Sequence, residues 1–220
     1  MDKRALKDLL YEQVARVGKA LASPKRLELL DLLAQGEKAV DALAGEAGID
    51  VKLASAHLKA LKDARLVQVR REGQRMIYRL RGDDIAQLGL SLRRVAEDHL
   101  DELRLALRDL MAEPERLTLL GRQALLAQAR RGEIVVLDVR PAAEFDTAHL
   151  PHARSLPLPE LAQRLAELPQ AAEIVAYCRG PFCLMADEAV ALLRARGHRA
   201  RKLAEGVTEW QAAGLPIQRP

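Results

Sequence analysis

The sequence predicts two domains: a mainly α-helical N-terminal domain and a C-terminal α/β domain built on a mainly parallel sheet. Three observations carry this prediction. The first 82 residues show helical spacing followed by one hairpin pattern, whereas residues 132–220 alternate short apolar strands with helices. Strand–helix alternation is typical of parallel sheets. The segment Ala-Glu-Pro-Glu at 112–115 breaks the helical pattern between them, so we expect domains over residues 1–112 and 117–220.

Bulk composition excludes several classes of protein. The chain of 220 residues is 49% hydrophobic and 30% charged, which is typical of a globular protein that folds in water. We expect a cytoplasmic protein without a membrane partner, because no apolar run is long enough to span a bilayer and the polar N-terminus is no signal peptide. Two cysteines are too few for a disulfide scaffold. No residue spacing is that of a zinc or iron–sulfur site, so we expect no metal and no cofactor.

The basic charge is confined to one end of the chain. Residues 1–82 hold 17 Lys and Arg against 11 Asp and Glu, a balance of +6, while residues 83–131 and 132–220 each balance at −1. An excess of positive charge in one domain favours a polyanionic partner for that domain.

The N-terminal domain is predicted from apolar periodicity and from residues that begin or end helices. Ser23-Pro24 begins the second helix, Gly48 follows the third, and Asp50 caps the fourth. The expected elements are a helix carrying Leu6 to Leu21, helices Pro24–Ala34, Val40–Ala47 and Val51–Ala64, and a hairpin of Leu66–Arg70 and Met76–Leu80 around a basic tip at 71–75.

Two short helices followed by a basic hairpin are the layout of a winged helix-turn-helix, whose second helix enters the major groove of duplex DNA. The candidates for DNA contact are Lys52, Ser55, His57 and Lys59 on the recognition helix and Arg70, Arg71 and Arg75 on the wing. The alternative for each is a solvated polar face. For His57, a hydrogen-bonded structural role is an equal alternative.

A long helix from about Asp84 to Met111 carries an apolar stripe that includes Leu88, Leu92 and Val95 on a charged rod. Such a stripe must be covered. Pairing with the first helix and with a second chain would cover it, which predicts a homodimer with two recognition helices about one DNA turn apart. A scaffold role within one chain is the alternative.

The C-terminal domain is predicted as alternating helices and strands. The expected elements are helix Leu119–Arg131, strand Ile134–Asp138, helix Ala142–Thr147, extended Ser155-Leu156, helix Pro159–Leu168, strand Glu173–Tyr177, helix Leu184–Arg196, strand Arg199–Leu203 and helix Val207–Ala213.

Both cysteines lie in the loop between a strand and a helix. Cys178 directly follows the apolar run 174–177, where α/β sheets bind their ligands. Successive backbone N–H groups and the helix N-terminus are expected to lower the pKa of its thiol and to make it nucleophilic. Arg179 adds positive charge and could bind an anionic substrate. The alternatives are a small buried hydrophobe at Cys178 and, at Cys183, either a second redox thiol or a small residue that closes the loop.

Residues 20–80 resemble the ArsR-type winged-helix repressors, through ALASPKRLELL, SAHLKALKDARLV and RREGQRMIYRL. The resemblance implies a homodimer that binds a palindromic operator and releases it after a ligand or redox event. The metal sensors of this family carry cysteines in the helix before the turn, where this chain has Lys38 to Leu43. With no thiol in residues 1–177, that metalloid site is absent.

Residues 117–220 resemble a rhodanese (sulfurtransferase) domain, through VLDVRPAAEFDTAHLPHARSLPL, IVAYCRGPFC and GHRARKLAEGVTEWQAAGLPI. The resemblance implies that Cys178 accepts a sulfane sulfur as a persulfide and passes it to a thiol acceptor. Residues 179–183, including Gly180 and Phe182, would form the backbone cradle, Asp138 and Arg140 a supporting pair, and Trp210 a packing residue.

This chain departs from that pattern within the loop. Pro181 removes one N–H from the cradle, Cys183 stands where many sulfurtransferases have Arg or Ser, and Glu205 replaces a glycine. A phosphatase would need an arginine where this chain has Leu184, which argues against phosphatase activity.

Two hypotheses of function remain. The first is a dimeric DNA-binding regulator whose rhodanese-like domain senses or transfers sulfane sulfur through Cys178. The second is a sulfurtransferase whose winged helix serves for dimerisation or tethering. A persulfide at Cys178 could also be attacked by Cys183 to close a disulfide or polysulfide. Metalloid capture by the two thiols is a weaker option, because two thiolates make a poor zinc site.

Overall fold

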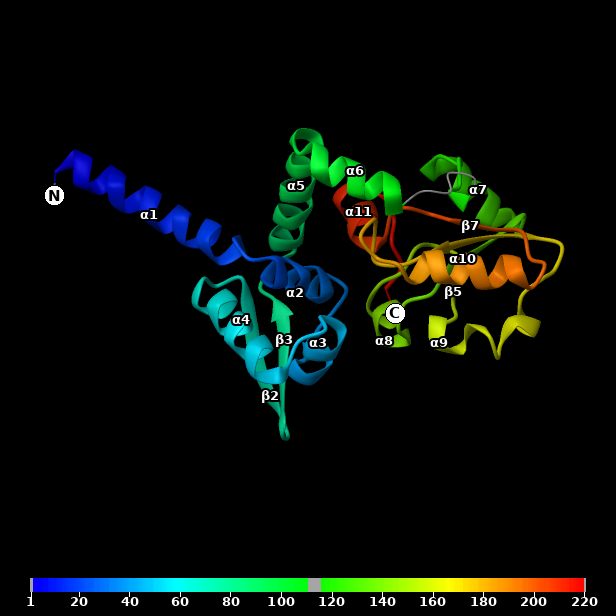
Figure 1. The fold of residues 1–220 in the computed structure, drawn as a ribbon, viewed down its shortest axis with the longest axis horizontal. Helices are drawn as coiled ribbons and strands as arrows, with labels where there is room; N and C mark the ends of the chain where they lie inside the picture. Colours follow the sequence, from blue (N-terminus) through cyan, green and yellow to red (C-terminus); the bar gives the residue numbers. More distant parts are fainter. Residues whose placement is uncertain (1, 111–115, 220) are drawn as a thin grey trace. The chain divides into compact units, whose positions relative to one another are not determined.

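The structure of the protein is a computed structural model that describes residues 2–110 and 116–219. The chain divides into two compact units whose border falls near Arg93 (Figure 1). The linker expected at 112–115 lies outside the described residues. No helix in the described ranges is long and apolar enough to cross a bilayer.

The first unit has the expected order of helices and one hairpin, with a short extra strand before the third helix. Its helices are α1 (Lys3–Leu21), α2 (Pro24–Ala34), α3 (Val40–Glu46), α4 (Val51–Asp63) and α5 (Asp83–His99), and its strands are β1 (Lys38–Ala39), β2 (Val67–Glu72) and β3 (Arg75–Leu80). The strands form one antiparallel sheet in the order β1-β3-β2. Two residues carry too little periodicity to predict β1 from the sequence.

The core of the first unit lies where α2, α3 and α4 meet. Leu29, Leu43, Leu58 and Leu61 are each 0% exposed and belong to one apolar cluster. Burying one such side chain contributes about 1.5–3 kcal/mol. The cluster fixes the angle between α3 and α4, and therefore determines which face of α4 remains at the surface.

The hairpin turns more tightly than the sequence indicated. Glu72 pairs with Arg75, so only Gly73 and Gln74 connect the strands. Gly73 has φ +60°, a left-handed conformation that glycine adopts without a steric penalty. Arg71 and Arg75 therefore lie at the ends of two paired strands rather than on an open loop. Figure 1 shows these strands, β2 and β3, joined by a narrow turn.

The long helix expected from Asp84 to Met111 is wrong in one respect. The structure has two helices, α5 and α6 (Asp101–Leu110), with Leu100 between them, and Met111 lies outside the described residues. Asp101 and Glu102 stand in the first turn of α6. Carboxylates favour a helix N-terminus because they face its positive dipole end, so they support a new start here.

The second unit has the predicted alternation of strands and helices. Its helices are α7 (Arg122–Arg131), α8 (Ala142–Thr147), α9 (Leu158–Leu161), the 3-10 turn η2 (Leu165–Glu167), α10 (Met185–Ala195) and α11 (Val207–Ala212), and its strands are β4 (Ile134–Asp138), β5 (Arg154–Ser155), β6 (Glu173–Tyr177) and β7 (Ala200–Lys202). All neighbouring strands run parallel, in the order β5-β4-β6-β7.

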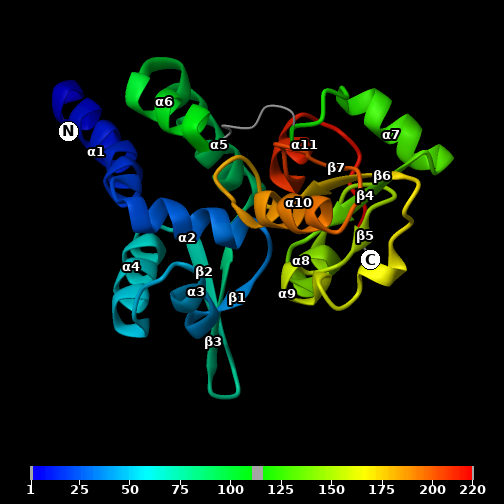
Figure 2. The ribbon, with the colours of Figure 1, turned by 45° about the vertical axis from the view of Figure 1, so that its right-hand side comes forward.

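This sheet is buried on both faces. Alternate residues of a strand point to opposite faces. Leu137 and Ala176 belong to one cluster with Leu161 of α9 and Ala189 of α10. Val136, Val175 and Tyr177 belong to a second cluster with Leu125 of α7 and Trp210 of α11. The helices therefore cover both faces of the sheet, with one layer on each face (Figure 2).

Two helix predictions in this unit are wrong in extent. The helix expected from Leu119 begins at Arg122, because the N–H of Thr118 bonds to the carbonyl of Lys202 and holds that segment extended beside β7. The helix expected over Pro159–Leu168 is divided into α9 and η2. Leu161 and Leu168 are both buried in the core, and this packing overrides helix propensity.

Candidate functional site

The thiol loop, residues 178–184, joins the carboxyl end of β6 to the start of α10. Cys178 is 1% exposed, whereas Cys183 is only partly buried. Both side chains pack against the apolar cluster beneath α10. The loop therefore folds back, so that its first and sixth residues lie together.

Backbone N–H groups surround the two sulfur atoms. Those of Gly180 and Ala186 donate to the Cys178 sulfur, and those of Arg179 and Met185 donate to the Cys183 sulfur. The Cys178 thiol also lies 3.4 Å from the carbonyl oxygen of Cys183. Amide donors of this kind stabilise negative charge on sulfur.

The expectation of a lowered pKa for Cys178 is wrong, because the neighbouring Cys183 and burial raise the pKa of this thiol. The neighbouring Cys178 in turn lowers the pKa of Cys183 to about 6, and the backbone amides and Arg179 act in the same direction. The two thiols therefore titrate together, and the less buried one, Cys183, is the more acidic.

The segment at the start of α11 packs closely against the thiol loop. A Cβ added at Gly206 would lie 2.7 Å from the carbonyl oxygens of Cys178 and Arg179. Gly180 has φ +138°, and a Cβ there would lie 2.8 Å from the Glu209 carboxylate. That carboxylate in turn accepts from the N–H of Gly206 at 2.8 Å. Sequence reasoning missed Gly206 and Glu209, and a glycine between strand and helix was the available signal.

Asp138 and Arg140 form a buried ion pair at the end of β4. Their side chains are 0% and 1% exposed, with Arg140 Nη2 at 2.6 Å from Asp138 Oδ2. The Tyr177 hydroxyl donates to the same carboxylate at 2.5 Å, and Arg140 Nη2 donates to the carbonyl of Ala148 at 2.8 Å. This network fastens β4, β6 and the segment after α8 beneath the thiol loop.

The sequence suggested that Arg179 could bind an anionic substrate. In the structure its side chain does not extend into solvent. Its guanidinium binds Glu144 of α8, with Nη2 at 2.5 Å from Oε1 and Nε at 3.0 Å from Oε2. The Glu144 carboxylate is 2% exposed and also lies 4.0 Å from Arg140. Arg179 therefore anchors the loop, and its charge favours the Cys183 thiolate. Glu144 was not singled out in the sequence.

The outer side of the thiol loop is apolar. Phe182 and Leu184 flank Cys183 and are 51% and 49% exposed. The predicted cradle residue Phe182 therefore lies at the surface, where it borders the approach to the partly buried sulfur.

On the recognition helix α4, Asp50 caps the N-terminus as predicted and accepts from the N–H of Leu53 at 2.8 Å. Lys52, Ser55 and Lys59 lie within one face, since an α-helix turns by 100° per residue. Lys52 and Lys59 are exposed and Ser55 is half-buried. His57 lies about 140° around the helix from Lys52 and is half-buried, so it does not share that face.

The three wing arginines differ in their partners. Arg70 binds two carboxylates, Glu37 at 2.5 Å and Glu72, which offset its charge. Arg71 donates to the carbonyl of Gly73 at 3.0 Å, and Arg75 is exposed at the start of β3. The geometry thus favours Arg71 and Arg75 over Arg70 as the phosphate-facing charges of the wing.

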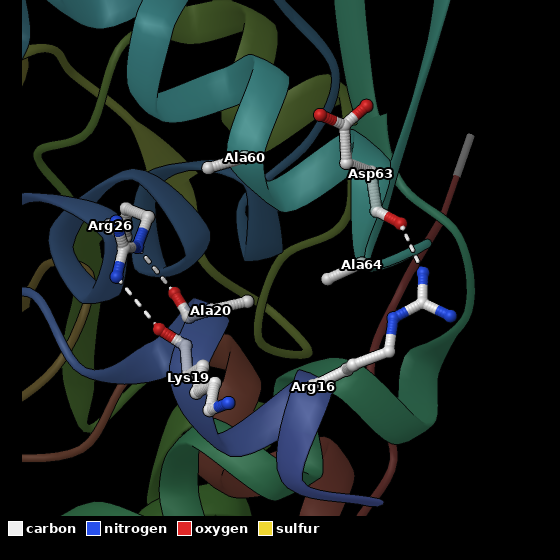
Figure 3. A pocket seen from close by; sticks show the side chains of 7 residues that line it. All are labelled: Arg16, Lys19, Ala20, Arg26, Ala60, Asp63 and Ala64. Carbon is white, nitrogen blue, oxygen red and sulfur yellow. Dashed lines mark hydrogen bonds between the residues drawn. The ribbon is translucent and has the colours of Figure 1, made fainter. Parts of the chain in front are cut away.

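An open basic pocket of about 270 Å³ lies where the end of α1 meets α2 and α4 (Figure 3). Arg26 donates to the carbonyl of Ala20 at 2.5 Å and to that of Lys19 at 2.9 Å. Arg16 donates to the carbonyl of Asp63 at 3.2 Å. Both guanidinium groups therefore bind helix C-terminal carbonyls, which fastens α1 to α2 and α4.

In the described ranges, no three acidic, His or Cys side chains converge as a metal site.

Two family profiles match the chain in the regions described above. Residues 23–69 match the bacterial regulatory proteins of the arsR family, and residues 122–213 match the rhodanese-like domain.

Individual proteins resemble either the whole chain or one half of it. The chain is 47% identical to the HTH-type transcriptional regulator Rv0324 of Mycobacterium tuberculosis over 211 residues, which cover 96% of this chain and 92% of that protein. A sulfurtransferase of Allochromatium vinosum is 32% identical over 89 residues, which cover 40% of this chain and 81% of that protein. The solution structure of a homodimeric winged helix-turn-helix domain from Mycobacterium bovis is 51% identical, covers 46% of this chain and 93% of that chain, and has a TM-score of 0.42.

Proposed function

Since the chain belongs to the arsR family of bacterial regulatory proteins and carries a rhodanese-like domain at its C-terminus, we propose that this transcriptional regulator responds to sulfane sulfur. In this proposal a small sulfur donor loads Cys178 as a persulfide, and the loaded protein binds its operator with a different affinity. A thiol acceptor then removes the sulfur and returns the protein to its first state.

The thiol pair is the observation that supports a response to sulfane sulfur. Four backbone N–H groups face the two sulfur atoms at the end of β6. One of the pair is a thiolate at neutral pH, because the pKa of Cys183 is lowered to about 6. A thiolate attacks sulfur far faster than a thiol does. An inert structural cysteine would need neither the amide donors nor a second thiol.

The DNA half is supported by the exposed faces of α4 and the wing. Lys52 and Lys59 project from the same face of the recognition helix, and Arg71 and Arg75 stand at the tip of the hairpin. Basic side chains on two projecting elements are suited to the phosphates beside one major groove. Lys59 also pairs with Asp63 at 3.4 Å on the exposed surface, an interaction that a phosphate could replace at little cost.

A homodimer is supported by apolar side chains left at the surface of α1 and α5. Leu10 and Val14 are 60% and 70% exposed, and Leu88 and Leu92 are 39% and 40% exposed. Apolar positions spaced along two helices are the pattern of a helix–helix interface between chains. The solved relative from Mycobacterium bovis is named as a homodimer.

Operator binding with and without donor tests the proposal. A duplex selected from a random-sequence library by the reduced protein serves as the operator, and fluorescence anisotropy gives the Kd before and after treatment with glutathione persulfide. We expect the Kd to change at least tenfold for the wild type and not for Cys178→Ser. An equal Kd before and after treatment of the wild type, with mass spectrometry showing an added sulfur on Cys178 or a disulfide there, would rule out the regulatory role.

A second function is supported by the sequence identity to the sulfurtransferase of Allochromatium vinosum. In that case the protein would act mainly as a sulfurtransferase, and the winged helix would serve for dimerisation. The assay is thiosulfate-to-cyanide sulfur transfer. Turnover lost in Cys178→Ser, together with an operator affinity that ignores the state of the thiols, would favour this function over the first.

A further inference from the structure

The second thiol of the loop has a position that sulfur loading alone does not explain. Cys178 is almost fully buried, its thiol lies 3.4 Å from the carbonyl oxygen of Cys183, and both cysteine side chains pack in one apolar cluster. A cysteine that only stored a persulfide would not need a second cysteine folded against it. In this loop the nearest nucleophile to any sulfur carried on Cys178 belongs to the same chain.

We propose that Cys183 is a resolving thiol, which attacks the Cys178 persulfide, closes a Cys178–Cys183 disulfide and releases hydrosulfide. The proposal rests on the proposed function in one respect, since the Cys178 persulfide must first form. It adds Cys183 to the residues that react with sulfur, and it gives the sensor a final state, the disulfide. The loaded protein is then a disulfide, and the persulfide is an intermediate.

Loading begins with a proton transfer within the pair. The Cys183 thiolate accepts the proton of the neighbouring Cys178 thiol, and the new Cys178 thiolate attacks the outer sulfur of a persulfide donor. The S–S bond of the donor breaks, and the donor thiolate leaves with the electron pair. Cys183 then loses its proton to water, because its pKa lies at about 6.

Resolution follows within the same loop. The Cys183 thiolate attacks the inner sulfur, which is the Cys178 Sγ. A bond forms between the two cysteine sulfurs, the bond to the outer sulfur breaks, and the outer sulfur leaves as hydrosulfide with the electron pair. The sulfane sulfur is reduced to sulfide while the two cysteines are oxidised to the disulfide, so no other oxidant is needed.

The structure favours attack on the inner rather than the outer sulfur. Attack on the outer sulfur would expel the Cys178 thiolate, whose pKa is raised by burial and by its neighbour. A sulfur leaving group departs faster as its pKa falls, and hydrosulfide is the weaker base. The Cys178 sulfur also lies 3.4 Å from the carbonyl oxygen of Cys183, so the attacking residue is already folded against its target.

The amides around Cys183 support its role as the attacking group. The N–H groups of Arg179 and Met185 donate to its sulfur, and the Arg179 guanidinium is fixed nearby by Glu144. These donors hold the thiolate in place before the persulfide forms, which lowers the entropy cost of the attack.

Mass spectrometry of the full chain under anaerobic conditions tests the inference. Wild type, Cys183→Ser, Cys183→Ala and Cys178→Ser are treated with glutathione persulfide, and a donor-only sample corrects the sulfide measurement. We expect the wild type to lose two hydrogens within the peptide that spans residues 178–183 and to release one hydrosulfide per chain. In both Cys183 variants the neighbour that most raises the pKa of Cys178 is gone, so Cys178 can lose its proton to water; these variants should accumulate one added sulfur on Cys178, with no hydrosulfide released above the blank. Trp210 fluorescence verifies that each variant is folded.

Each other outcome separates this inference from the proposed function. A wild type that stops at one added sulfur on Cys178 overturns the resolving role and leaves sulfur loading intact. An added sulfur that is found on Cys183 instead of Cys178, without hydrosulfide, overturns the attack on the inner sulfur. If neither the wild type nor the Cys183 variants gain sulfur or a disulfide, the proposed function fails together with this inference.

Discussion

Replacing Gly206 by alanine adds one methyl group where two chain segments already touch. The new Cβ would lie 2.7 Å from the carbonyl carbon and oxygen of Arg179 and from the carbonyl oxygen of Cys178. These neighbours are backbone atoms, so no side chain can rotate away. The thiol loop or the start of α11 must therefore shift by several tenths of an ångström.

The expected cost follows from that overlap. Overpacking by a single methyl group typically destabilises a protein by about 1–3 kcal/mol. With a urea dependence of about 1–3 kcal/mol per molar, the unfolding midpoint of this unit should fall by about 1 M. The shift of the loop should also slow sulfur loading of Cys178, because it displaces the peptide groups of the loop whose N–H groups face the sulfur.

The assay is urea unfolding of the full chain followed by tryptophan fluorescence. Trp210 of α11 is the single tryptophan of the sequence and is 0% exposed, so its signal reports on this unit and not on the winged helix. Gly121→Ala is the matched control, because a Cβ at Gly121 would meet nothing within 4 Å. Alanine caps a helix less well than glycine, so this control measures a capping loss of up to about 1 kcal/mol that does not involve the thiol loop.

One result would refute this reasoning. If Gly206→Ala unfolds at the same urea concentration as Gly121→Ala and loads sulfur at the wild-type rate, then the close approach of α11 does not hold the thiol loop in place.

Four further predictions test the rest of the protein. Lys52→Ala should weaken operator binding and reduce the slope of log K against log salt by about 0.9 if Lys52 neutralises one phosphate; anisotropy titrations at several salt concentrations measure the slope, and an unchanged slope removes that contact. Leu10→Asp should convert the dimer to a monomer in sedimentation velocity, and an unchanged mass would place the interface elsewhere. The rate of alkylation of Cys183 should rise as the pH is raised through 6, because the lowered pKa leaves a thiolate above that pH and a thiol below it. In Cys178→Ala the midpoint of this rise should move to higher pH, since the neighbouring thiol that lowers the pKa is lost. Arg140→Met should destabilise the second unit by about 3–5 kcal/mol, because it leaves a buried carboxylate unpaired; a urea midpoint equal to that of the wild type would contradict this role.

The sequence was most informative where local rules act alone. Ser23-Pro24, Asp50 and Gly73 mark helix starts and a turn, and the structure has these features where the residues predict them. The alternation of apolar strands with helices likewise predicted the parallel sheet of the second unit. Each of these signals depends on neighbouring residues and on backbone preference.

The errors arose where distant segments compete with local preference. The helix expected to start at Leu119 begins later, because Thr118 bonds to Lys202 across the sheet. Arg179 was expected to meet an anion, but it binds Glu144, which stands 35 residues earlier in the chain. Such contacts leave no periodic trace in the sequence.

By itself, the sequence determined the order of the two domains, the recognition helix and the loop that holds both cysteines, because these follow from local periodicity and from motifs. Only the tertiary structure decided which thiol is the more acidic. Loop folding brings Cys183 against a buried Cys178, and the neighbouring thiol and burial then outweigh the lowering of the Cys178 pKa that its position at the strand end predicts.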